Sequence, residues 1–309
     1  MCWTSLILLV GSIPNRGVFP FSRDNSIGSL YPADDGQARR SANGYFKAAK
    51  TGIRKKIPTI ATPDSEVVLL TNKFVAPLTS VIITQNTFRI NYGRKHNKVN
   101  GFFEDQYLQP GYFIPDKKAL IGHGINPHEK YAVIRFVGWT ANHDLFKKGI
   151  TMKQKEEFVN ALNKHCKVYV SSEKALSPRL SKFLLPTPPN LVHQVLHFAS
   201  LYVGDSQTMA TEAALLGTPS VRVNSFVGQN DMSNFMELEN NYKMLYNFPD
   251  ISAATNKAIE LIESSAVKDE WLQKRAAYYC NRGDINDEIL EIILDTVKQK
   301  INRVSVDGK

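Results

Sequence analysis

The chain has 309 residues, of which 43% are hydrophobic and 22% are charged, and its formal net charge is +9 at pH 7. A chain of this length has room for one large or two ordinary domains with their own cores, so it needs no metal or disulfide as a staple. The three cysteines, Cys2, Cys166 and Cys280, lie far apart and form no C-x-x-C pair. Their spacing argues against a zinc site and a disulfide framework, and it favours a reducing, cytoplasmic location.

The positive charge is concentrated in the N-terminal third. Residues 1–100 hold 14 Lys and Arg against 5 Asp and Glu, whereas the remainder holds 24 of each kind. The densest basic segments are 54–56 and 94–98. A patch of this kind is either a solvated basic face or a surface that attracts phosphates, nucleic acid or an anionic membrane. Aromatic and basic residues do not interleave here, which argues against a nucleic-acid module.

The first 56 residues show little regular pattern. The apolar run within residues 1–12 lacks the basic region and the cleavage site of a signal peptide and is too short to span a bilayer, so it predicts a buried strand or a disordered tail. Residues 13–50 are rich in Gly, Ser, Asn, Arg and Pro and show no sustained period before residues 42–49. We expect an irregular arm or a shortened domain over residues 1–50.

From Ile57 onwards the sequence alternates between strand and helix patterns. The expected strands are 57–62, 80–84, 98–100, 131–137, 167–171, 201–203, 220–223 and 244–246. The expected helices are 66–75, 153–165, 191–199, 208–216 and 253–263, followed by two more that begin at Asp269 and Asp287. This alternation predicts an α/β protein with doubly wound parallel sheets and right-handed crossovers. A proline-containing loop near residues 110–115 divides a partial N-terminal domain, 51–115, from a C-terminal domain, 116–309.

The segment 201–219 carries the sharpest signal. An apolar strand ends at Gly204, and a helix begins within two or three residues. The first turn of this helix contains Ser206, Gln207 and Thr208, whose backbone N–H groups and helix dipole favour an anion. The end of a parallel strand is also where open α/β sheets bind ligands. The alternative is that Asp205 or Ser206 simply caps a buried helix.

This segment and several others resemble an uncharacterised prokaryotic family, known only as a domain of unknown function, with a fold of the GT-B type. At greater distance the chain is similar to UDP-N-acetylglucosamine 2-epimerase and to GT-B glycosyltransferases. The resemblance covers residues from about 57 to 275. The motifs that carry it are 204–213, 217–219, 224–226, 135–139, 142–144, Pro188-Pro189 with His193, and 100–102 with Glu104.

The resemblance implies two Rossmann-type domains, of which the N-terminal one is incomplete here. In epimerase-like relatives the Asp-Ser segment at this turn binds the diphosphate, and a Glu six residues after the Ser takes the ribose hydroxyls. Carried over, this places Ser206, Gln207 and Thr208 at the diphosphate and Glu212 at the ribose. The epimerase has glycines where this chain has Gln207 and Thr208, so a bound diphosphate is expected to lie less close to the backbone.

A second group of candidate residues follows the strand 131–137. The resemblance places Arg135, Trp139, Asn142 and His143 toward a ligand, with Arg135 or His143 near phosphate charge and Trp139 stacking on a base or sugar. Trp139 is equally well explained as a core residue, and Asp144 as a partner of Lys147 or Lys148. His193 fits a structural role better than a ligand-binding one.

Two further candidates complete the expected site. Asn224, after the strand 220–223, is taken as a substrate-binding residue. Glu104, after the segment 100–103, is the candidate acid or base of the N-terminal half, together with His143 of the C-terminal half. The Asp-Ser-Glu sequence at 64–66 is an alternative source of an acid. No metal site and no cofactor are expected.

The main expectation is a protein that acts on a nucleotide diphosphate sugar, with UDP-sugars favoured, by glycosyl transfer or epimerisation in surface polysaccharide synthesis. The relatives begin with a strand and a His-bearing loop that the first 56 residues do not show. A non-catalytic nucleotide-sugar-binding or assembly module is therefore the alternative. The acceptor is not indicated, and the basic excess is compatible with peripheral contact with an anionic membrane. A homo-oligomer is compatible with the sequence, whereas a nucleic-acid binder rests on charge alone.

Overall fold

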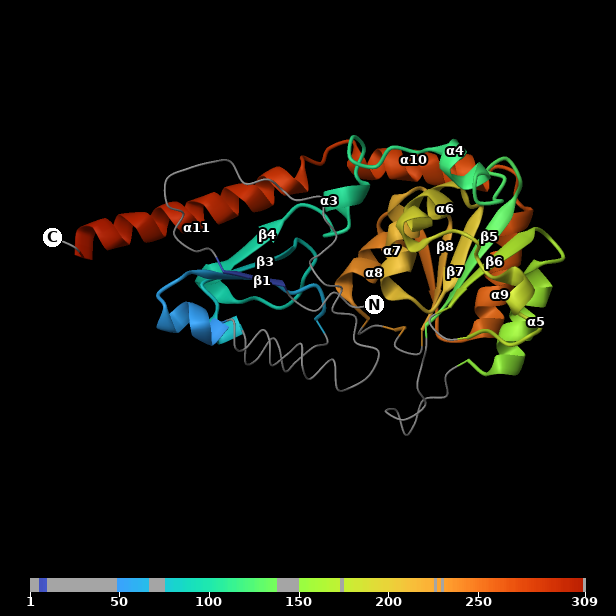
Figure 1. The fold of residues 1–309 in the computed structure, drawn as a ribbon, viewed down its shortest axis with the longest axis horizontal. Helices are drawn as coiled ribbons and strands as arrows, with labels where there is room; N and C mark the ends of the chain where they lie inside the picture. Colours follow the sequence, from blue (N-terminus) through green and yellow to red (C-terminus); the bar gives the residue numbers. More distant parts are fainter. Residues whose placement is uncertain are drawn as a thin grey trace. The chain divides into compact units, whose positions relative to one another are not determined.

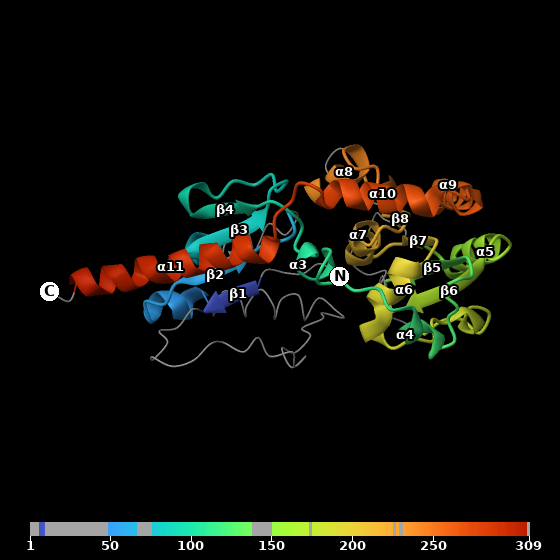
Figure 2. The ribbon, with the colours of Figure 1, turned by 90° about the horizontal axis from the view of Figure 1, so that it is seen from above.

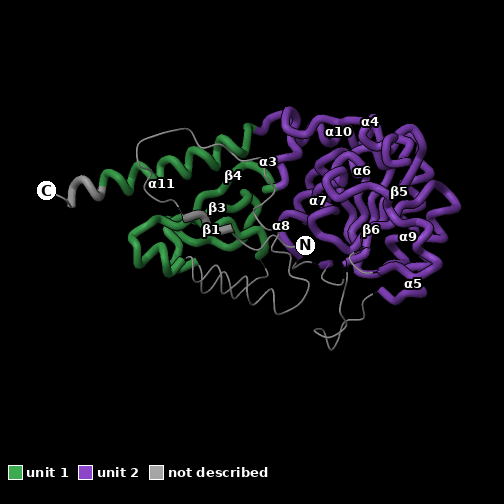
Figure 3. The backbone as a smooth tube through the Cα atoms, in the orientation of Figure 1, with its two compact units in different colours: residues 1–103, 283–309 green, residues 104–282 purple. Residues whose placement is uncertain are grey.

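The computed structural model describes residues 6–9, 49–66, 76–137, 150–172, 175–224, 227–228 and 231–307. The chain forms two compact units (Figure 3). Unit 1 consists of residues 1–103 and 283–309, and unit 2 of residues 104–282. The sequence placed the boundary between the two domains after residue 115. In the structure, the segment 104–115 belongs to unit 2 and the C-terminal helix belongs to unit 1.

Unit 1 is built on a four-stranded sheet. Its strands are β1 (Leu6–Leu9), β2 (Thr59–Thr62), β3 (Val81–Gln85) and β4 (His96–Val99), in the order β1-β2-β3-β4. The pairs β2–β3 and β3–β4 are parallel, whereas β1 runs antiparallel to β2. The apolar run near the N-terminus thus contains a strand, as one of the two alternatives predicted. The helix expected at 66–75 lies outside the described residues after Glu66.

One long helix, α11 (Ile285–Asp307), covers this sheet. Figures 1 and 2 both show α11 lying along the sheet strands of unit 1. Ile285 of α11 packs in one cluster with the strand residues Ile60, Ile83 and Val99, all of which are buried. The backbone N–H of Asn100 also donates to the Glu288 carboxylate at 2.8 Å. The core of unit 1 is therefore made from two segments that are far apart in the sequence.

Unit 2 contains a five-stranded parallel sheet. Its strands are β5 (Tyr131–Phe136), β6 (Lys167–Ser172), β7 (Leu201–Gly204), β8 (Ser220–Val223) and β9 (Leu245–Phe248). Their order in the sheet is β6-β5-β7-β8-β9, and every pair is parallel. The chain leaves β5 toward β6 on one side and returns to β7 on the other, so the switch point lies between β5 and β7. All five strands lie where the sequence pattern predicted them, within one or two residues.

Helices pack on this sheet and on one another. The helices of unit 2 are α3 (Asp105–Leu108), α4 (Lys117–Ile121), α5 (Met152–Leu162), α6 (Val192–Phe198), α7 (Gln207–Leu215), α8 (Ser233–Asn240), α9 (Ile251–Glu263) and α10 (Val267–Tyr279). In Figure 1, α5 and α9 lie on one side of the sheet and α6 and α7 on the other. Because both faces are covered, the strands are almost continuously buried, as parallel strands usually are.

Local sequence signals fix the helix ends in unit 2. Thr151 and Gln154 form a reciprocal capping box at the start of α5. Asp250 accepts hydrogen bonds from the first N–H groups of α9. Gly217, at φ +75°, follows the last turn of α7 in the left-handed conformation expected for a residue after a helix end. Among the described helices, none is both long and apolar enough to cross a membrane.

Candidate functional site

The candidate site lies at the carboxyl end of β7, at the point where the chain leaves the sheet beside β5. Gly204 is the last residue of β7, and the two strands approach closely at this point. A Cβ atom on Gly204 would lie 2.6 Å from the carbonyl oxygen of Arg135 and 2.7 Å from the hydroxyl oxygen of Tyr202. No side chain fits that space. Glycine is therefore required for β7 to pack against the end of β5.

Asp205 connects the ends of the same two strands. Its carboxylate accepts a hydrogen bond from the backbone N–H of Val137 at 2.7 Å, and its side chain is almost fully buried. Burial raises the pKa of Asp205 to about 6, although the Val137 N–H and the charges of Lys155 and Arg135 act in the opposite direction. Because its carboxylate is committed to the backbone after β5, Asp205 shapes the site and is poorly placed to face a ligand.

Ser206 caps α7. It has an extended backbone conformation, and its hydroxyl oxygen accepts a hydrogen bond from the N–H of Met209 at 3.4 Å. Ser206 is therefore the N-cap residue of α7. Capping does not remove the anion preference of the helix start, since the first-turn N–H groups and the dipole point out of the same end. Gln207 and Thr208, both half-buried, form that first turn.

Glu212 lies one turn further along α7 on the same face as Thr208, four residues earlier. Its side chain is only 9% exposed. Its Oε1 atom accepts a hydrogen bond from the hydroxyl of Tyr107 at 2.9 Å and lies 3.1 Å from Nε2 of His193. Among the described residues, Oε2 of Glu212 has no hydrogen-bond partner. Glu212 is thus a buried carboxylate with one oxygen occupied by the protein.

Tyr107 and His193 were not predicted as partners of Glu212. Tyr107 comes from α3 and His193 from α6, and their ring centroids are 5.3 Å apart. Burial, followed by the negative charge of Glu212, raises the pKa of Tyr107 well above its usual value, so its hydroxyl remains a proton donor. The structural role expected for His193 is compatible with this contact. The contact also brings His193 next to Glu212, a candidate site residue.

Glu104 lies close to the same cluster. It occupies the position just before α3, and its charge contributes to the raised pKa of Tyr107. Its neighbour Asp105 has a different role, because each of its carboxylate oxygens accepts a hydrogen bond at 2.7 Å, from the hydroxyls of Tyr278 and Tyr279. The structure therefore places the candidate acid Glu104 and the candidate ribose ligand Glu212 around one tyrosine.

Arg135 and Asn224 lie at the ends of neighbouring strands. Arg135 of β5 donates to the hydroxyl of Ser171 on β6 at 2.8 Å, and its positive charge acts on Asp205. Asn224 directly follows β8 and is buried; its backbone N–H donates to the carbonyl of Phe248 at 3.0 Å. Both residues thus belong to the same edge of the sheet as Ser206. Trp139, Asn142, His143 and Asp144 fall in 138–149, outside the described residues.

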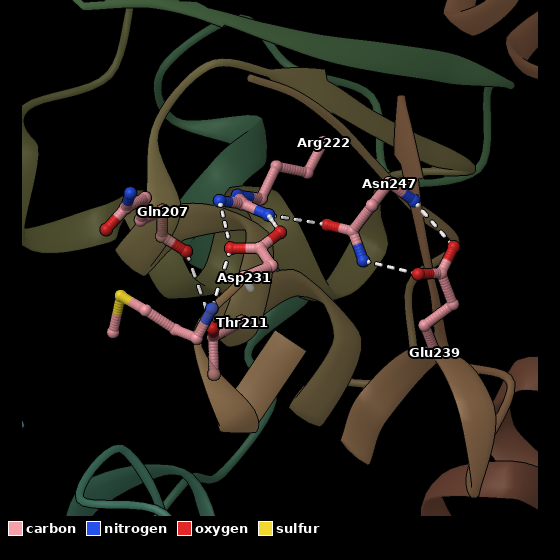
Figure 4. Close-up of polar contacts among 7 residues, drawn as sticks. Gln207, Thr211, Arg222, Asp231, Glu239 and Asn247 are labelled. Carbon is pink, nitrogen blue, oxygen red and sulfur yellow. Dashed lines mark hydrogen bonds and ion pairs between the residues drawn. The ribbon is translucent and has the colours of Figure 1, made fainter. Parts of the chain in front are cut away.

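A chain of polar side chains near the ends of β8 and β9, of which Arg222 and Asp231 are buried, was not predicted from the sequence. Arg222 of β8 is fully buried and contacts Asp231 at 2.6 and 3.1 Å and Asn247 at 2.7 Å. Asn247 in turn donates to the Glu239 carboxylate through both its backbone and side-chain nitrogens. Figure 4 shows these four side chains in a row. The available signal was an arginine inside the apolar strand 220–223, which requires a buried partner.

Neither a metal site nor a ligand site in the sheet of unit 1 receives support from the described residues. Within them, no group of three or more His, Cys, Asp or Glu side chains is arranged to hold a metal ion. A cavity of about 320 Å³ occurs in unit 1, lined by Lys56, Thr59, Ser80 and Lys300 among others. It lies at the amino ends of β2 and β3, opposite to the edge at which open parallel sheets bind ligands.

Comparisons with known proteins identify the fold. No protein-family model matches the chain, so the domain-of-unknown-function family suggested by the sequence is not confirmed, and no curated protein sequence matches it. The chain is similar to the structure of Methanocaldococcus jannaschii UDP-GlcNAc 2-epimerase in complex with UDP-GlcNAc and UDP. That similarity has a TM-score of 0.52 at 12% identity and covers 86% of this chain and 83% of the epimerase chain.

Two glycosyl- or polymer-transferring proteins are similar at lower scores. The glycotransferase of kitacinnamycin has a TM-score of 0.43 at 12% identity, over 84% of this chain and 63% of that one. The wall teichoic acid polymerase TagF has a TM-score of 0.43 at 11% identity, over 75% of this chain and 61% of that one. The chain spans less than two thirds of the length of either. The expected fold class is confirmed by the epimerase similarity and the topology: this is an α/β protein of the GT-B type, with three parallel strands in the sheet of unit 1 and a five-stranded parallel sheet in unit 2.

Proposed function

We propose that unit 2 binds a nucleotide diphosphate sugar at the carboxyl end of β7. The observation that carries this proposal is the arrangement along α7, in which a capped helix start is followed, one turn later on the same face, by a buried carboxylate. Four residues of α-helix rise by about 6 Å, which suits a ligand whose diphosphate and ribose are directly linked. Ser206, Gln207 and Thr208 would hold the diphosphate, and Glu212 would accept from the ribose hydroxyls.

The neighbouring strand ends supply further contacts in this proposal. Arg135 is close enough to Asp205 to affect its pKa and would offset phosphate charge at the switch point. Asn224, at the end of β8, would contact the sugar or the base. The proposed site needs no metal, because N–H donors would hydrogen-bond the diphosphate and Arg135 would offset part of its charge. The bound UDP-GlcNAc and UDP of the epimerase structure make UDP-sugars the favoured ligands.

We further propose glycosyl transfer or sugar epimerisation as the reaction, in a cytoplasmic step of surface polysaccharide synthesis. Glu104 is the candidate general acid or base, since its charge acts on Tyr107 and so lies near the proposed ribose site. His143, Trp139 and Asn142 remain candidates from the sequence. The non-catalytic binding module is the second candidate function. It is favoured by the described part of unit 1, in which three strands are mutually parallel and β1 is antiparallel to them.

The first test is thermal unfolding of the full chain in the presence of UDP, GDP, CMP and UDP-sugars. A nucleotide at 100 times its dissociation constant should stabilise the protein by about 2.7 kcal/mol. Glu212→Ala should abolish this stabilisation, because the variant loses the proposed ribose acceptor. Glu157→Ala, which removes an exposed glutamate of α5, is the matched control and should leave the stabilisation intact. If no nucleotide shifts the unfolding midpoint of the wild-type chain, the proposed site is wrong.

Turnover separates the two candidate functions. Under saturating nucleotide sugar, an enzyme releases the nucleotide or alters the sugar, whereas a binding module returns the ligand unchanged. Release of UDP, or a new sugar isomer that disappears in Glu104→Gln, would support catalysis. Saturable binding with neither product, in the presence of a range of acceptors, would support the module.

A further inference from the structure

The contacts of Glu212 differ from those of an ordinary surface glutamate. Two donors from different elements, Tyr107 of α3 and His193 of α6, converge on the same oxygen, Oε1. Their rings lie 5.3 Å apart at 33° to each other, so each limits the movement of the other. A glutamate side chain has three rotatable bonds, and these contacts restrict the carboxylate to one orientation. The protein therefore determines which oxygen is offered to a ligand.

The remaining oxygen is suited to one kind of partner. Among the described residues, Oε2 of Glu212 accepts no hydrogen bond. The side chain is 9% exposed, and Oε2 is not one of the fully buried polar atoms that lack a partner, so this oxygen can be reached from solvent. An ionised carboxylate accepts only, so its partner must be a donor such as a hydroxyl. A ligand that covers Oε2 without donating to it would leave this charged acceptor desolvated and unpaired, which is costly, so the site should penalise a ligand that lacks the donor.

We infer that Tyr107 and His193 are positioning residues that aim Oε2 of Glu212 at the ribose hydroxyls and make the site selective for ribonucleotides over deoxyribonucleotides. This inference rests on the proposed function, since it requires a nucleotide on α7. Tyr107 suits the role because its hydroxyl stays protonated beside the carboxylate. His193 contributes an Nε2–H donor, and its side chain is 30% exposed, which places it at the margin of the cluster.

The test compares nucleoside diphosphates with their 2′,3′-dideoxy counterparts. Calorimetric titration of the full chain with UDP, CDP, GDP and ADP identifies the preferred base, and the matching dideoxy compound is then titrated. We expect the ribonucleotide to bind on the order of 10- to 100-fold more tightly, as for a hydrogen bond to a charged group. In Tyr107→Phe and His193→Leu this ratio should fall severalfold, while the affinity for the dideoxy compound stays within about twofold.

Two further variants separate positioning from a general loss of packing. His193→Gln retains an N–H donor at a similar reach and should recover much of the ratio that His193→Leu loses. Tyr131→Phe is a matched control, because it removes a buried tyrosine hydroxyl that donates to the Val195 carbonyl at 2.7 Å, at the opposite end of β5. It should lower the unfolding midpoint and leave the ratio unchanged.

The outcomes distinguish this inference from the function on which it rests. If the ribonucleotide binds but Tyr107→Phe and His193→Leu weaken both compounds equally, or leave the ratio unchanged, the positioning role is wrong and the nucleotide site stands. If no nucleoside diphosphate binds the wild-type chain, the proposed function itself is overturned. A ratio near one in the wild-type chain would show that Glu212 does not contact the ribose.

Discussion

In unit 2, residues that are close together in the sequence have structural roles or proposed binding roles. Asp205, Ser206 and Glu212 occur within eight residues, yet each has a different partner: the backbone after β5, the first turn of α7, and the Tyr107–His193 pair. The carboxylate of Asp205 is occupied by the fold, whereas one oxygen of Glu212 is not. Neighbouring acidic residues in one motif are therefore expected to respond differently to substitution.

Asp205 should make stability depend on pH. Its pKa is raised from 3.8 to about 6 in the folded protein, so the folded state binds a proton more readily than the unfolded state between these values. The stabilisation that this proton provides is present below about pH 4 and is lost as the pH rises through about 6, amounting to about 3 kcal/mol. Asp205→Asn keeps an oxygen that can accept from the Val137 N–H and cannot ionise.

We therefore expect the variant to lose this part of the pH dependence. Urea unfolding of the wild type and Asp205→Asn at pH 4, 5, 6 and 7 measures the difference in stability between them. That difference should change steadily in favour of the variant as the pH rises through the window. A constant difference across all four pH values would contradict the raised pKa of Asp205.

At the scale of elements, the Arg222–Asp231 pair ties β8 to the start of α8. Asp231 directly precedes Met232, the residue before α8, and its carboxylate also accepts from the Met232 N–H at 2.8 Å. Arg222 lies over the ring of Phe235 on α8, with 3.8 Å between the guanidinium carbon and the ring centroid. This pair therefore anchors the start of α8 to β8.

Removing one partner of this pair should cost more stability than removing both partners together. Arg222→Met removes the guanidinium from the buried carboxylate of Asp231 and should destabilise the protein by about 3–5 kcal/mol. The double variant Arg222→Met/Asp231→Leu removes both charges and should recover a large part of that loss. Chemical denaturation measures all three proteins. As a control, Arg179→Met removes an exposed partner of Glu156, with an arginine side chain that is 84% exposed, and should change stability by less than about 1 kcal/mol. Equal losses in the single and double variants would contradict this account.

The elements that the sequence predicted well are those whose apolar pattern is long and continuous. The strands of unit 2 are buried on both faces, so the apolar runs at 131–136 and 201–204 identify them directly. The short helices α3, α4 and α8 were not predicted, because four to eight residues with mixed polarity show no clear period. The sequence predicted a strand only from Lys98, whereas β4 begins at His96. The polar residues at the start of β4 obscure the strand pattern.

The candidate site was predictable only in its local part. Ser206 and Glu212 follow from one contiguous motif, and the capping geometry of Ser206 agrees with the sequence. The partners of Glu212 do not follow from it, because Tyr107 is 105 residues away and the pairing depends on how α3 packs against α7. The sequence also did not identify Asp231 as the partner of Arg222, although they are only nine residues apart. This pairing, too, depends on packing, here of the start of α8 against β8.

At the scale of the whole molecule, the two units have separate cores. Among the described residues, the main core cluster of unit 2 comes from residues 104–282, whereas that of unit 1 combines α11 with residues before 104. Each unit should therefore respond to its own core substitutions. The position that tests this most directly is Ile285, which is 1% exposed and packs with Ile60 and Ile83.

Ile285→Ala should weaken unit 1 selectively. Truncating a buried isoleucine costs about 2–5 kcal/mol through lost burial and the cavity that remains. Hydrogen exchange should show faster exchange of the β3 and β4 amides, with unchanged exchange in β5 and β7. Val203→Ala in β7 is the converse control and should loosen unit 2 alone. Uniformly faster exchange in both units after either substitution would show that the two cores unfold as one.

The return of α11 to unit 1 also has a consequence during synthesis on the ribosome. Residues 104–282 form one uninterrupted stretch that can complete its core as soon as it has emerged. The strands β2, β3 and β4 emerge earlier, but their apolar residues lack α11 until about 180 further residues have been made. The middle of the chain can therefore complete its core before its beginning does, and the apolar residues of the early strands stay without their α11 partners during that time.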